Sequence, residues 1–176
     1  MYPADSTFRE FFGTARFVHP APASLQTLNL HFPFLKVDYE PFIVPNPNGE
    51  TITDLHDRVA YTLHRIIEEA DEHPAQPVAI LICTHAATMI CIGRALTGNM
   101  PEDVNKADFN CGTCALSTYD RLFKTIVTEK VEHWDPTKVG YVPRLRWRKA
   151  GGVMGAWNSI VNGDCSHLRN GEERPW

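Results

Sequence analysis

The sequence has no apolar run long enough to cross a membrane and no excess of positive charge. A membrane-spanning helix needs about 18 or more consecutive apolar residues, and no stretch of the 176 residues reaches that length. The first residues, Met1 to Asp5, do not resemble a signal peptide. A formal net charge of −4 at pH 7 argues against a chain that grips nucleic acid by itself. We therefore expect a nuclear or cytoplasmic protein without membrane contact or direct nucleic-acid binding.

Cysteine is scarce, and its odd count of five argues against a disulfide framework. Cys83 and Cys91 lie in apolar segments, which is typical of buried free thiols in a reducing compartment. Cys111 and Cys114 have the spacing of a zinc or redox motif. A zinc site would need a second ligand pair at short spacing, and a redox motif should open a helix, whereas a strand pattern follows here. A structural role is therefore favoured over a thiol oxidoreductase, and we expect no metal and no cofactor.

No internal repeat or low-complexity tract appears, and the length suits one ordinary domain. The first fifty residues are rich in proline and phenylalanine, which predicts an ordered excursion with at most a short helix near 25–30. We divide the chain into a domain over 1–135 and a glycine- and tryptophan-rich extension over 136–176. Strand-like alternation is present over 115–120 and 124–131. The basic run 144–149 is either a solvated edge strand or a weak nucleic-acid contact.

The clearest helix follows residue 51. Its apolar stripe has spacings of three and four and consists of Ile52, Leu55, Val59, Leu63, Ile66, Ile67 and Ala70. Thr51 and Asp54 form a weak capping box, and His73-Pro74 ends the helix. Asp54 and Arg58 stand four residues apart, so the simplest interpretation of that pair is a surface ion pair.

The most informative stretch is 78–97. Residues 78–84 are apolar or small without alternation, which predicts a strand buried on both faces, as in parallel sheets. Residues 86–97 predict a helix that closes at Gly98. His85 then lies where a strand ends and a helix begins, which is where open α/β sheets bind ligands and where a helix favours anions. The alternative is a histidine that only caps the turn.

His85 is the candidate for phosphoryl chemistry. Transfer through a histidine needs a nucleophilic imidazole, donors around the phosphate oxygens and an acid for the leaving group. The backbone N–H groups of Ala86 and Ala87 can hold the oxygens. Glu10 is the candidate acid, because its aromatic neighbours would desolvate it and favour the protonated form. The alternative for Glu10 is an ordinary surface carboxylate.

Several short motifs together resemble the second half of a phosphoglycerate mutase-like histidine phosphatase. They are Asn48-Gly49-Glu50-Thr51-Ile52, Arg58-Val59 and Ile82-Cys83-Thr84-His85-Ala86. In that superfamily a helix with this opening precedes a buried strand that ends in the second active-site histidine, here His85. Glu10, followed three residues later by Gly13, resembles the acid loop. The resemblance implies catalytic roles for His85 and Glu10, and a phosphate site made by His85, Ala86 and Arg58.

Longer segments look like a narrower branch of the superfamily. Residues 13–17, 56–63 and 83–89 are similar to the fungal branch related to the small tau subunit of TFIIIC, the RNA polymerase III transcription factor. The tail over 162–174 resembles a C-terminal extension of that branch.

The sequence departs from the superfamily at its nucleophile, because no Arg-His-Gly motif occurs in it. The implied fold is α/β, an incomplete three-layer phosphoglycerate mutase-like sandwich. We expect a mostly parallel sheet that lacks its first strand, plus a loop- and β-rich C-terminal extension. Either the sequence is a fragment or shortened gene model, or something else fills the gap.

These features predict a truncated or degenerate histidine phosphatase fold that acts mainly as an interaction module. Its expected partners are other subunits of an RNA polymerase III transcription-factor assembly. The alternative function is an active phosphomonoesterase that uses His85 with Glu10 as acid, with phosphate or a phosphomonoester as ligand.

Overall fold

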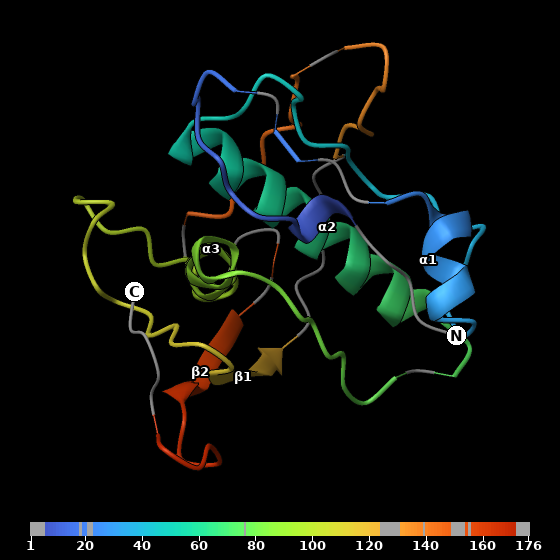
Figure 1. Cartoon of the computed structure of the whole chain (residues 1–176). Helices are drawn as coiled ribbons and strands as arrows, with labels where there is room; N and C mark the ends of the chain where they lie inside the picture. Colours follow the sequence, from blue (N-terminus) through green and yellow to red (C-terminus); the bar gives the residue numbers. More distant parts are fainter. Residues whose placement is uncertain are drawn as a thin grey trace.

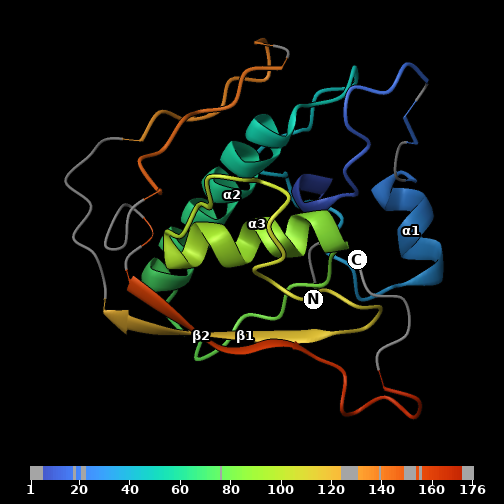
Figure 2. The ribbon, with the colours of Figure 1, turned by 90° about the vertical axis from the view of Figure 1, so that its left-hand side faces the viewer.

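Two packed helices cover a two-stranded antiparallel sheet in the computed structural model (Figure 1). The structure describes residues 6–17, 19–20, 23–75, 77–123, 131–138, 140–148, 154 and 156–171. Its elements, in chain order, are η1 (Ser6–Phe8), α1 (Leu25–His31), α2 (Ile52–Glu72), α3 (Ala86–Thr97), β1 (Leu116–Phe123) and β2 (Ala156–Asp164). Helix α3 lies between α2 and the sheet, as Figure 2 shows from the side. No described helix combines the length and the apolar composition that a bilayer-spanning segment requires.

The start of α2 confirms the predicted capping box. The Thr51 hydroxyl accepts from the Asp54 backbone N–H at 3.2 Å, and the Thr51 N–H donates to the Asp54 carboxylate at 3.0 Å. These reciprocal bonds satisfy backbone donors that a helix N-terminus otherwise leaves without partners. The helix ends at Glu72 with His73 as its C-cap, just before Pro74, as predicted.

The core lies between α2 and α3. Helix α3 closes at Gly98 in the left-handed region, with φ of 70°, which confirms the predicted C-cap. The buried core cluster combines Leu55, Val59, Leu63, Ile92, Ala95 and Leu96 with Trp147 and Met154. Two of its members therefore come from the region after residue 135, which packs against the same core as the helices.

Strand β1 confirms the strand predicted over 115–120, whereas most of the second predicted strand, 124–131, lies outside the described residues. The C-terminal region supplies β2, which pairs with β1 along its length. The proposed boundary at residue 135 stays a prediction, and the β1–β2 ladder crosses it.

The buried strand predicted over 78–84 is wrong for this structure. These residues form no strand, and Val78 is fully exposed while Leu81 is 83% exposed. A strand buried on both faces lies within a sheet that other elements cover on both sides, and the described residues place no strand beside this segment. The described sheet is antiparallel, so the mostly parallel sheet also receives no support here.

The cysteines form no disulfide. Cys91 is buried in α3 as predicted, and burial raises the pKa of its thiol to about 12, which keeps it protonated and unreactive. Cys83 is exposed, contrary to the prediction, because the segment that carries it is not a buried strand. Cys111 is buried and Cys114 is exposed, with a left-handed φ of 60°.

Candidate functional site

His85 and Glu10 meet at the N-terminus of α3. His85 is the N-cap residue of that helix, and its side chain makes no capping hydrogen bond. Its Nδ1 instead lies 2.8 Å from Glu10 Oε2. The two side chains are 56% and 31% exposed, so solvent reaches the pair. The structure therefore brings both predicted catalytic residues together, and Glu10 is less desolvated than its aromatic neighbours led us to expect.

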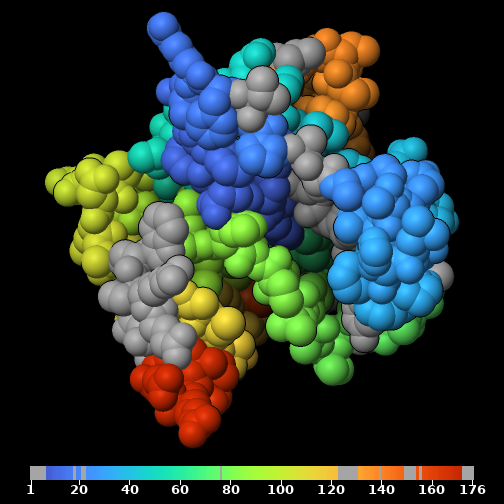
Figure 3. Space-filling model, in the orientation of Figure 1, coloured from blue at the N-terminus to red at the C-terminus, as the bar shows by residue number. Residues whose placement is uncertain are grey.

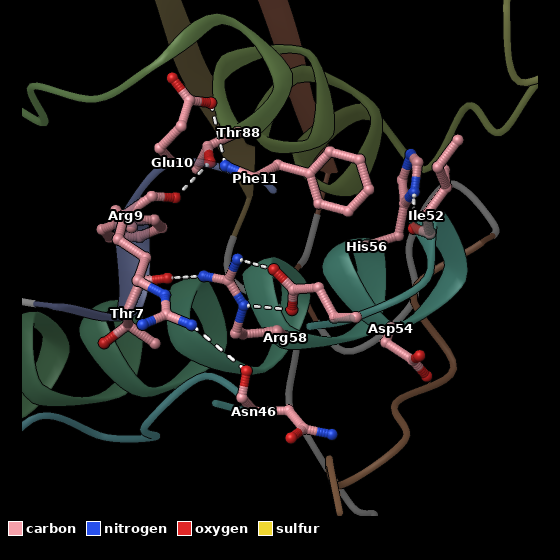
Figure 4. Close-up of polar contacts among 12 residues, drawn as sticks. Thr7, Arg9, Glu10, Phe11, Asn46, Ile52, Asp54, His56, Arg58 and Thr88 are labelled. Carbon is pink, nitrogen blue, oxygen red and sulfur yellow. Dashed lines mark hydrogen bonds and ion pairs between the residues drawn. The ribbon is translucent and has the colours of Figure 1, made fainter. Parts of the chain in front are cut away.

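Two threonines fix the loop that carries Glu10. The Thr84 hydroxyl donates to the Phe8 carbonyl at 2.6 Å, and the Thr88 hydroxyl donates to the Arg9 carbonyl at 3.2 Å. The other Glu10 carboxylate oxygen accepts from the Phe11 N–H at 2.9 Å. Figure 4 shows Glu10 and Thr88 on the α3 side of this loop. These threonine contacts could not be predicted from the sequence, because they join residues more than seventy positions apart.

Ala86 opens the first turn of α3. The N–H groups of a first helical turn have no acceptor within the helix, and the helix dipole places partial positive charge there. Ala86 and Ala87 follow His85 directly, so these donors lie beside the imidazole. Their predicted contact with phosphate oxygens is consistent with this placement.

Arg58 lies elsewhere, fully buried under the loop (Figure 4). Its Nε donates to Glu50 Oε2 at 2.8 Å, a second nitrogen pairs with Glu50 Oε1, and the third donates to the Thr7 carbonyl. The predicted surface ion pair with Asp54 is wrong, because Asp54 instead caps α2. Arg58 is 0% exposed, so an anion at the surface cannot touch it in this conformation. Its role as a phosphate ligand stays a prediction; here it anchors η1.

Arg9 is a second guanidinium beside this pair. It donates to the Asn46 carbonyl at 3.3 Å, and its Nε is buried without a hydrogen-bond partner among the residues that the structure describes. Burial, and then the positive charge of Arg58, lower the Arg9 pKa from its ordinary value. Two arginines thus face the one carboxylate of Glu50.

A shallow pocket lies on the other side of Arg58. It is lined by Val44, Pro45, Asn46, Glu50, Asp54, Arg58, Gly140, Tyr141 and Val142. Neither His85 nor Glu10 belongs to it, so this pocket is not the catalytic candidate.

A second buried polar network joins α2, α3 and the C-terminal region. Arg94 of α3 binds both carboxylate oxygens of Asp108, at 2.8 Å and 3.0 Å, and lies 3.3 Å from His56 Nε2. His56 Nδ1 lies 2.7 Å from the Ile52 carbonyl and therefore carries the hydrogen. Burial is the main reason why the His56 pKa lies below its ordinary value, so the neutral ring accepts from Arg94.

Trp147 completes this network. Its ring stacks on His56 with centroids 5.8 Å apart and an interplanar angle of 2°. Its indole N–H donates to Asp57 Oδ1 at 3.2 Å. Sequence reasoning missed these residues, since a helical stripe identifies apolar positions but not which polar side chains are buried.

The chain is similar to a known protein family over more than half of its length. Residues 33–131, more than half of the chain, match the family described as the histidine phosphatase superfamily (branch 1). The chain belongs to the histidine phosphatase superfamily. The matched region of this histidine phosphatase domain contains Arg58 and His85, whereas Glu10 lies before it. The family has an α/β fold, which agrees with the α/β class predicted from the sequence.

One curated relative covers nearly the whole chain. The transcription factor tau 55 kDa subunit of Saccharomyces cerevisiae is 30% identical over 164 residues, which is 90% of this chain and 36% of that protein. The chain therefore spans about a third of the length of this relative.

Proposed function

We propose that this histidine phosphatase domain serves mainly as an interaction module of an RNA polymerase III transcription-factor assembly. Similarity to the yeast tau subunit supports a transcription-factor role, with other subunits as partners and the nucleus as its location. The observation that carries the interaction role is the exposed segment, defined as residues 78–84 (Figure 3).

The exposed segment has no charged residue and no proline over seven positions. Val78 is fully exposed and Leu81 is 83% exposed, with Ile80 half exposed. Burying a valine or leucine side chain stabilises by about 1.5–3 kcal/mol, and an exposed apolar segment of this kind promotes association. A strand of another subunit, laid along this segment, would bury these side chains and would come close to His85.

The geometry around His85 supports this role over catalysis. A phosphate group needs cations, yet Arg58 is buried against Glu50 and Thr7. The Glu10 carboxylate lies 2.8 Å from His85 Nδ1, and an ionised carboxylate at this position repels an anion. The sequence also contains no Arg-His-Gly motif to supply the usual nucleophile.

Co-purification tests the interaction role. The chain is tagged and expressed with the other subunits of the transcription factor, and Leu81→Lys is compared with Leu30→Lys. Both leucines are 83% exposed, but Leu30 lies on α1, outside the exposed segment. We expect Leu81→Lys to lower the recovered subunits at least tenfold while Leu30→Lys does not. Equal recovery with both variants would exclude the exposed segment as the interface.

The contact between His85 and Glu10 favours one second function, a phosphomonoesterase. In that reaction a ring nitrogen of His85 attacks the phosphorus as the bond to the alcohol oxygen breaks. Protonated Glu10, released from its contact with Nδ1, gives its proton to the departing oxygen, and water later cleaves the phosphohistidine. The N–H groups of Ala86 and Ala87 would hold the phosphate oxygens. Hydrolysis of p-nitrophenyl phosphate that is lost in His85→Ala and kept in His31→Ala would favour the phosphomonoesterase over the interaction role. We expect no release of p-nitrophenol above the blank.

A further inference from the structure

Residues 143–148, here called the arginine strip, alternate between core and solvent. Pro143 and Trp147 are fully buried and Leu145 is half-buried. Between them, three arginines are exposed, namely Arg144, Arg146 and Arg148. The Arg144 side chain is 80% exposed and that of Arg148 is 50% exposed. A two-residue period is that of an extended backbone, so one face of the strip is apolar and the other cationic.

The strip is held in place by its buried face. Trp147 stacks on His56 and donates to Asp57, which is a buried residue of α2. Its ring also lies under the Arg148 guanidinium, 5.3 Å from ring centroid to carbon. Such a contact restricts the arginine side chain and lowers the entropy lost when it binds.

Two of the three arginines share a single acidic side chain among the described residues. Arg144 and Arg148 share one carboxylate, that of Asp57, at 3.8 Å and 3.7 Å. That carboxylate is 8% exposed and already accepts the Trp147 N–H, so it lies beneath the arginines and not among them. The two guanidinium groups therefore present charge outward that Asp57 neutralises only in part.

We propose that the arginine strip docks an extended acidic segment of a partner protein, with carboxylates on alternate residues. Alternate side chains of an extended chain are about 6.6 Å apart, so acidic residues at that repeat would meet the arginines in register. Nucleic acid fits less well, because the chain is acidic as a whole and the strip carries only three cations.

This inference does not rest on the exposed segment. Figures 1 and 2 place the strip, in orange, beyond the N-terminal half of α2, whereas the exposed segment runs near the sheet at the opposite side. The two surfaces can therefore contact different parts of an assembly, and an experiment can exclude binding at one surface without excluding binding at the other.

Fluorescence anisotropy tests the proposal with the full chain and two labelled peptides. In the first peptide four glutamates alternate with serine or valine, and in the second the same residues place the four glutamates consecutively. We expect the alternating peptide to bind at least tenfold more tightly than the consecutive one. Because exposed charges are screened by salt, binding should weaken at least tenfold between 50 mM and 500 mM salt, values we choose to span strong and weak screening.

Two double variants make the test specific. Arg144→Gln with Arg148→Gln should weaken binding at least tenfold, whereas Arg16→Gln with Lys36→Gln removes two exposed charges elsewhere and should leave it unchanged. Arg144→Gln alone removes a side chain that is 80% exposed, so it keeps the fold intact and should still weaken binding severalfold. Equal binding by the arginine variants, no preference for the alternating peptide, or tighter binding of a single-stranded oligonucleotide would each overturn the proposal.

Discussion

Replacing Arg58 with methionine should strongly destabilise the domain. The guanidinium is 0% exposed and satisfies both carboxylate oxygens of Glu50, which is itself 8% exposed. Methionine removes both guanidinium contacts of that buried carboxylate, with Arg9 as the cation that remains near it, and removes the donor to the Thr7 carbonyl. Breaking a buried ion pair from one side costs about 3–5 kcal/mol, which is a large share of a typical domain's stability.

Urea unfolding followed by tryptophan fluorescence measures this loss. The chain has four tryptophans, and Trp147 is 1% exposed, so its emission reports on the core. With a urea dependence of about 2 kcal/mol per molar, the midpoint should fall by about 2 M. Arg65→Met is the control, because Arg65 lies on the same helix and pairs with Glu68 at the surface, where such a pair is worth about 0–1 kcal/mol.

The double variant Arg58→Met with Glu50→Leu separates charge from packing. Replacing both members of a buried ion pair by apolar residues is often neutral, so the double variant should recover most of the loss. A loss below about 1 kcal/mol in Arg58→Met, or a double variant as unstable as the single one, would refute the reasoning.

Three further changes have expected outcomes. Burial lowers the His56 pKa below its ordinary 6.5, so the unfolded chain binds a proton at this residue more readily than the folded chain does. The urea midpoint should therefore fall as the pH drops below about 6.5, and this fall should be smaller in His56→Gln. Gly49→Ala places a Cβ 2.1 Å from the Gly13 carbonyl oxygen at a φ of +90°. Calorimetry should therefore show a loss above about 1 kcal/mol, larger than for Gly171→Ala, where φ is +69° but the space is open. Trp147→Ala should cost about 3–5 kcal/mol in urea unfolding, and a smaller loss than in Gly49→Ala would contradict its place in the core.

Much of the local structure could be predicted from the sequence. The capping box of Thr51 and Asp54, the end of α3 at Gly98 and the alternation of β1 depend on neighbours within a few residues. Local hydrogen bonds and side-chain period decide such features, so a sequence carries their signal directly. The family resemblance rested on motifs of the same short range, and it is confirmed by the match over 33–131.

Contacts between distant residues could not be predicted in this way. A pattern four residues apart favoured Asp54 as the partner of Arg58, yet folding brings Glu50 and Thr7 to it instead. The apolar run 78–84 has the composition of a buried strand, but burial requires a sheet around the run and elements that cover both faces of that sheet, which its own residues cannot specify.

The sequence alone determined the helices and turns of this domain, its superfamily and the residues worth examining at the start of α3. Tertiary structure decided which of them meet, because it set His85 against Glu10 and enclosed Arg58. The physical reason is range: helix caps and apolar periods act over a few bonds, whereas burial and ion pairing depend on chain segments that only folding brings together.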